Sequence, residues 1–115
     1  NPAALRTNLR SLRKGGVLVV DSDSFGKNDL RKAGYSQSPL EDDSLKEYKV
    51  VKVPMTELNR AAVADLGLGT RAADRCRNFF ALGIVYWLYD RSLDPTVQWI
   101  DAKFKKVADV GEANK

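Results

Sequence analysis

The chain has 115 residues, of which 43% are hydrophobic and 30% are charged, and it carries a formal net charge of +4. This length suits one globular domain of common size. The chain contains no histidine, which excludes imidazole general bases, Ser-His-Asp or Cys-His nucleophiles and histidine-containing zinc sites within it. The small positive excess permits anion binding but is common among ordinary proteins.

The sequence favours a cytoplasmic location without membrane insertion. Its longest apolar stretch, residues 79–89, is well short of the roughly 18 residues that a membrane-spanning helix needs. The N-terminal residues lack the charged, apolar and small-residue order of a secretory signal. The single Cys76 cannot form an internal disulfide, which fits a reducing compartment.

The first half of the chain predicts two strands among short helices. Asn1 and Pro2 are a favoured cap and first residue for a helix that reaches about residue 13, where Gly15-Gly16 ends it. Residues 17–20 are a short run rich in valine that predicts a buried, parallel strand. A short helix over 27–33 should stop at Gly34, a turn-rich connector follows over 35–44, and residues 48–53 have strand composition.

The second half of the chain predicts three helices. The first spans residues 56–66, with its apolar side formed by Leu58, Ala61 and Ala62. Thr70 should cap the longest helix, which runs to about residue 89. The C-terminal half of that helix is apolar all round, so we expect other elements to enclose it. A last helix begins at Asp94-Pro95 and should bury four residues: Val97, Trp99, Ile100 and Phe104.

The order of these elements predicts an α/β fold. We expect part of a three-layer α/β/α domain, with a small parallel sheet and a helix-rich C-terminal half. Two strands make a marginal sheet by themselves. Together with the start on a helix cap, this suggests that residues 1–115 belong to a larger α/β domain.

The sharpest local signal for chemistry is Asp21-Ser22-Asp23-Ser24 at the end of the first predicted strand. Phosphatases of the haloacid dehalogenase type place a nucleophilic and an acidic Asp two residues apart at such a strand end, where carboxylates also hold magnesium. The only candidate for the second acidic pair is Glu41-Asp42-Asp43, which no strand precedes. We therefore favour a loop-capping role for Asp21 and Asp23 and keep the phosphatase as an alternative.

Two further patterns have structural interpretations that we prefer. The stretch Gly67-Leu68-Gly69-Thr70-Arg71-Ala72 matches a dinucleotide-binding pattern, but it follows a predicted helix where that pattern requires a strand. A basic helix face could meet nucleic-acid phosphates, although no nucleic-acid-binding motif accompanies it. That face consists of Arg6, Arg10, Arg13 and Lys14.

The role of the polar face near the start of the longest helix stays open. Arg71, Arg75 and Asn78 recur there at helical spacing. They are either balanced by Asp74 and neighbouring carboxylates or in contact with an anion or a partner subunit. We expect the amide of Asn78 to be at least partly buried. Cys76 lies near apolar neighbours and should be a small buried hydrophobe.

Taken together, several blocks resemble the gamma domain of 2-oxoacid:ferredoxin oxidoreductases, in the 2-oxoglutarate synthase version fused ahead of the alpha domain. The most specific block is Arg77-Asn78-Phe79-Phe80-Ala81-Leu82-Gly83, similar to the family's "kNmfaLG". The other blocks occur in the family's order: Asn1 to Leu5, Val19 to Phe25, Ala33 to Tyr35, Pro39 to Asp42, and Val53 to Thr56. The chain departs from the pattern at Asp21, where the family has Asn, and lacks the "GxGGqG" turn that opens the domain.

The resemblance implies that residues 1–115 are the C-terminal portion of such a gamma-type domain. The parent complex would decarboxylate a 2-oxoacid oxidatively and form an acyl-CoA, with thiamine diphosphate, magnesium and an iron–sulfur cluster as cofactors. Its alpha and beta parts would be the partners of this segment, and ferredoxin would be reached through the complex. We expect this segment to hold no catalytic residue, metal or cofactor, and to bind neither nucleic acid nor membrane. The resemblance assigns no cofactor-binding residue.

Overall fold

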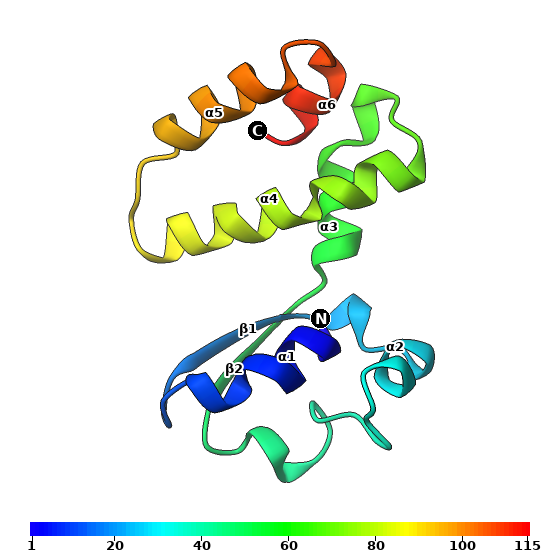
Figure 1. Ribbon diagram of the computed structural model, residues 1–115, viewed down its shortest axis with the longest axis vertical. Helices are drawn as coiled ribbons and strands as arrows, with labels where there is room; N and C mark the ends of the chain where they lie inside the picture. The colour runs from blue at the N-terminus through cyan, green and yellow to red at the C-terminus, as the bar shows by residue number, and fades with distance from the viewer. The chain divides into compact units, whose positions relative to one another are not determined.

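The computed structural model describes residues 1–115 as two compact units, Asn1–Pro54 and Met55–Lys115. Both strands belong to the first unit, and the second unit consists of helices and their connections (Figure 1). This confirms the predicted α/β class with a small parallel sheet and a helix-rich C-terminal half. No helix has the length and apolar character that crossing a membrane requires.

The sheet of the first unit has two parallel strands. β1 (Val17–Asp21) pairs with β2 (Lys49–Val53), with Val19 opposite Val51. Parallel strands need a crossover connection. Here the crossover contains η2 (Ser22–Ser24), α2 (Lys27–Lys32) and η3 (Asp43–Leu45).

Helix α1 (Pro2–Asn8) lies beside β1. The side chain of Asn1 accepts a hydrogen bond from the Ala4 N–H at 2.9 Å, so the predicted cap is confirmed. The helix is shorter than predicted because its last turn tightens into η1 (Leu9–Ser11) and Leu12 is already extended. Leu5, Leu9 and Leu12 line a groove of about 310 Å³ against β1, which confirms their apolar stripe.

The second unit begins with α3 (Met55–Ala62) and η4 (Ala64–Leu66). Gly67 ends them with a φ of +63°, in the left-handed region where glycine carries no steric penalty. α4 (Thr70–Leu88) packs against α3 and α6, and α5 (Asp94–Phe104) packs against α6 (Ala108–Ala113). The sequence analysis missed α6, a helix of less than two turns.

Three expectations about buried surface in this unit are wrong. The buried stripe of α3 is Met55, Asn59 and Val63, whereas Leu58, Ala61 and Ala62 are exposed. Of the residues expected to be buried in α5, Ile100 is buried and Val97 and Phe104 are half-buried, but Trp99 is half-exposed. The C-terminal half of α4 is not enclosed, since Val85, Trp87, Leu88 and Tyr89 are all exposed.

Candidate functional site

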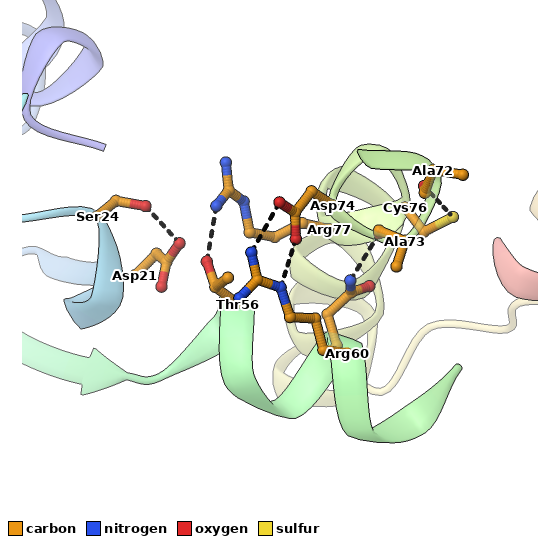
Figure 2. A network of polar contacts seen from close by, with 10 residues as sticks. Asp21, Ser24, Thr56, Arg60, Ala72, Ala73, Asp74, Cys76 and Arg77 are labelled. Atoms are coloured by element: carbon orange, nitrogen blue, oxygen red, sulfur yellow. Dashed lines mark hydrogen bonds and ion pairs between the residues drawn. The ribbon is translucent and has the colours of Figure 1, made fainter. Parts of the chain in front are cut away.

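The end of β1 is a hydrogen-bonded turn. Asp21 is buried, and one of its carboxylate oxygens accepts a hydrogen bond from the Ser24 hydroxyl at 2.6 Å (Figure 2). The other oxygen accepts a hydrogen bond from the Asp23 N–H at 3.2 Å. A bond from the backbone N–H two residues further on is how an aspartate side chain stabilises a turn. The loop-capping interpretation of Asp21 is therefore confirmed. Asp23 is exposed and supplies the backbone N–H of that turn.

The acidic stretch Glu41-Asp42-Asp43 does not complete a phosphatase site. Asp42 accepts a 2.8 Å hydrogen bond from the Ser44 N–H and caps η3. Hydrogen bonds from Ser44 hold the pKa of the Asp42 carboxyl below its ordinary value. No group of three or more His, Cys, Asp and Glu side chains is placed to hold a metal ion.

The predicted basic helix face is interrupted, because Arg6 is its only residue within α1, and Arg6 and Lys14 are engaged in contacts inside the first unit. The guanidinium of Arg6 donates hydrogen bonds to the carbonyls of Ala33 and Gly34 just beyond the end of α2, and it lies 5.5 Å from the centre of the Tyr35 ring. Lys14 forms a 2.6 Å ion pair with Glu47. These contacts favour the structural interpretation of this face over nucleic-acid binding.

The glycine-rich stretch at the start of α4 follows a helical element, as predicted. Gly67 ends η4, and Gly69 is the N-terminal cap residue of α4. The prediction that Thr70 caps this helix is wrong, because Thr70 is its first helical residue and no side chain caps it. The stretch lacks the preceding strand of a dinucleotide-binding site.

The polar face of Arg71, Arg75 and Asn78 is exposed along α4. The expectation that the Asn78 amide is partly buried is wrong. Ala73 and Cys76 lie on the buried face of α4 instead. Cys76 is 1% exposed, which confirms the prediction that it is a small buried hydrophobe. Burial raises the pKa of the Cys76 thiol above its ordinary value.

The polar contacts that join α3 to α4 use other residues. Arg60 forms a two-point ion pair with Asp74, with its Nε at 2.7 Å and an Nη at 2.8 Å from the two carboxylate oxygens (Figure 2). Those hydrogen bonds lower the pKa of the Asp74 carboxyl. Arg77 donates to the Thr56 hydroxyl at 2.6 Å. Asp74 thus balances Arg60, a partner that the sequence analysis did not consider.

The most deeply buried amide of this unit is Asn59, which is 2% exposed. Its Nδ2 donates a 2.8 Å hydrogen bond to the backbone carbonyl of Ala73 in α4. The four-residue spacing of Met55, Asn59 and Val63 could have predicted that Asn59 lies on the buried face of α3. It was missed because a polar residue is not counted as part of an apolar stripe.

Comparison with known proteins places the whole chain in one family. Residues 1–115 match the family of pyruvate ferredoxin/flavodoxin oxidoreductases, and the chain belongs to this family. It is 41% identical over 114 residues to the 2-oxoglutarate oxidoreductase subunit KorA of Mycobacterium tuberculosis. This match covers 99% of the chain but 18% of that relative, so the chain spans less than a fifth of the relative's length. No solved structure matches the chain significantly.

Proposed function

We propose that this chain is part of a 2-oxoacid:ferredoxin oxidoreductase. Such a complex decarboxylates a 2-oxoacid oxidatively, transfers the acyl group to coenzyme A and passes the electrons to ferredoxin. The observation that carries the proposal is the family match over residues 1–115. The 41% identity to a 2-oxoglutarate oxidoreductase subunit favours 2-oxoglutarate as the substrate.

Within that complex, residues 1–115 act as the C-terminal portion of a gamma-type domain that contacts the alpha and beta parts and holds no catalytic site. Two features support this role. The exposed end of α4 carries large apolar side chains, with Trp87 81% exposed. Large exposed apolar patches mark interaction surfaces. Asp21, the one buried carboxylate, already accepts hydrogen bonds within its own turn.

The side chains of this segment do not fit the cofactors of such a complex. Iron–sulfur clusters are held by four cysteine thiolates, and the chain has only Cys76, which is buried. Magnesium is held by carboxylates together with substrate phosphates, and the acidic side chains here form no group suited to a metal ion. We therefore assign thiamine diphosphate, magnesium and the cluster to other parts of the complex, which we place in the cytoplasm.

Purification of the complex from its native cells through a tag on this chain tests the proposal. The purified material should contain the other oxidoreductase parts and reduce ferredoxin or methyl viologen only when a 2-oxoacid and coenzyme A are both present. The alternative is a phosphatase at Asp21. Hydrolysis of p-nitrophenyl phosphate that Asp21→Asn abolishes and Asp43→Asn preserves, without activity on 2-oxoacids, would replace our proposal with that alternative.

A further inference from the structure

A groove runs along one edge of the sheet in the first unit, between α1 and β1, and we call it the α1–β1 groove. Its volume is about 310 Å³. Residues 17–20, four consecutive positions of β1, line it. Consecutive side chains of a strand point to opposite faces of a sheet. A groove that meets all four positions therefore follows the edge of β1 instead of one of its faces.

The backbone at this edge of β1 lacks hydrogen-bond partners. Lys49 donates a 2.9 Å hydrogen bond to the Gly16 carbonyl. Because backbone groups point alternately to the two sides of a strand, Leu18 and Val20 also face β2, and Val19 faces away. No backbone–backbone hydrogen bond outside the sheet reaches Val19. Backbone groups that leave water are nearly always paired, so the edge at the half-buried Val19 suits another strand.

The two strands of the sheet differ in what they present to an added strand. β2 carries two exposed lysines, Lys49 and Lys52, and lysines on edge strands are a common device against strand addition. Residues 17–20 of β1 carry no charge, and α1 and η1 add three leucines to the wall of the groove. Parallel strands with such apolar runs are normally covered on both faces. An apolar, extended segment therefore fits the β1 edge.

The path of the chain identifies which segment can reach this edge. α1 and α2 pack against each other, so both lie on the same face of the sheet (Figure 1). Crossovers between parallel strands are right-handed in about 98% of cases. The crossover through α2 leads from β1 to β2. A crossover of the same hand through α1 must therefore start on the other side of β1, at the α1–β1 groove, whose lining includes Asn1.

We propose that the residues directly before Asn1 in the parent protein form a β-strand that pairs in parallel with the free edge of β1 and fills the α1–β1 groove. This inference rests on the proposed function, in which residues 1–115 are the C-terminal portion of a longer domain. The added strand makes β1 an internal strand and pairs the backbone of Val19. It also gives the sheet the third strand that independent stability commonly needs.

Amide hydrogen exchange at single-residue resolution is the first test, on the parent polypeptide expressed without its partner subunits. The Val19 N–H should exchange about a hundredfold or more slowly than an unstructured amide, as a hydrogen-bonded strand amide does. Leu18, whose N–H faces β2, is the internal control for a folded sheet. Fast exchange at Val19 beside slow exchange at Leu18 would overturn the inference. Slow exchange at Val19 only in the assembled complex would also overturn it, since the strand would then come from a partner.

Disulfide cross-linking in the assembled complex is the second test. Val19→Cys is combined in turn with a cysteine at each of about ten positions before Asn1. Neighbouring strands lie about 4.8 Å apart, within the roughly 7 Å between Cα atoms that a disulfide can span. We expect an intrachain disulfide at one or two positions and none at their immediate neighbours, whose side chains point to the other face. Val51→Cys is the matched control, because Val51 lies opposite Val19 on β2, about two strand spacings from the added strand, and should form none.

Two cross-linking results would overturn the inference. A disulfide between two copies of the chain would make a second copy the occupant, and the absence of any disulfide would leave the β1 edge without this strand. The 2-oxoacid-dependent reaction of the unsubstituted tagged complex should persist in either case, so the inference can fail while the proposed function stands. A tagged complex without that reaction contradicts the proposed function, and the exchange rate of Val19 still shows whether a strand pairs with β1.

Discussion

Replacing Asn59 with alanine tests how α3 is held against α4. Asn59 is 2% exposed and donates a 2.8 Å hydrogen bond to the Ala73 carbonyl. Loss of a partner for a buried polar group costs about 1 to 3 kcal/mol. Alanine recovers up to about 0.7 kcal/mol of helix propensity. The net loss of unfolding free energy should therefore be about 1 to 2 kcal/mol.

For a unit of this size, a loss of about 1 kcal/mol lowers the melting temperature by roughly 4 to 8 °C. We expect Asn59→Ala to melt roughly 5 to 15 °C below wild type when followed by circular dichroism at a helix wavelength. Asn78→Ala is the matched control, because Asn78 is an exposed amide on α4. It gains the same helix propensity without losing a buried hydrogen bond, so it should melt at or up to roughly 6 °C above the wild-type temperature. Equal melting of Asn59→Ala and wild type would refute the assignment of this hydrogen bond.

Three further predictions concern single positions. Asp90 has a φ of +48°, a left-handed conformation that favours glycine. Asp90→Gly should therefore raise the melting temperature by a few degrees, and a lower melting temperature would contradict this reasoning. Arg60 lowers the pKa of the Asp74 carboxyl, so the ion pair stabilises the folded state at pH values above the ordinary carboxyl pKa. That stabilisation is lost as the pH falls through the lowered pKa of Asp74 in the folded state. In urea unfolding at pH 7, Asp74→Asn should therefore lower the unfolding free energy by at most about 1 kcal/mol, and by progressively less below about pH 4. An equally large loss of unfolding free energy at pH 2 would refute the ion pair. The Cys76 thiol, buried and with a raised pKa, should react with Ellman's reagent far more slowly in buffer than in 6 M guanidinium, and equal rates would show that it is accessible.

The sequence predicts elements well where backbone chemistry is local. The cap at Asn1, the stop at Gly34 with its φ of +79° and the parallel pairing of the two valine-rich strands were all predictable. The cap and the stop follow from residues whose preferences act within a few positions, an amide that caps a helix and a glycine that accepts a left-handed turn. The strand pairing follows from the composition of the two strands and from the long connection between them. The resemblance to the oxidoreductase family is also confirmed by the family match.

The sequence is less informative where the outcome depends on which face of a helix meets another. Asn59 and Asn78 are chemically identical, but the rotation of α3 and α4 buries the first and exposes the second. Trp87 was expected inside because the end of α4 is apolar all round, and yet it is 81% exposed. A helix that is apolar on all sides is expected to be buried. Its sequence does not say whether the residues that bury it belong to the same segment.

The central claim, that this chain works as part of a 2-oxoacid:ferredoxin oxidoreductase, is tested most directly by the reaction of the tagged, purified complex. Acyl-CoA formation and viologen reduction should be measured with 2-oxoglutarate and coenzyme A, and then with each omitted in turn. We predict that both signals appear together, that both vanish when either substrate is omitted, and that the 115-residue chain alone gives neither. Viologen reduction that continues without coenzyme A or without a 2-oxoacid, or a purified complex with no 2-oxoacid-dependent activity, would contradict the account.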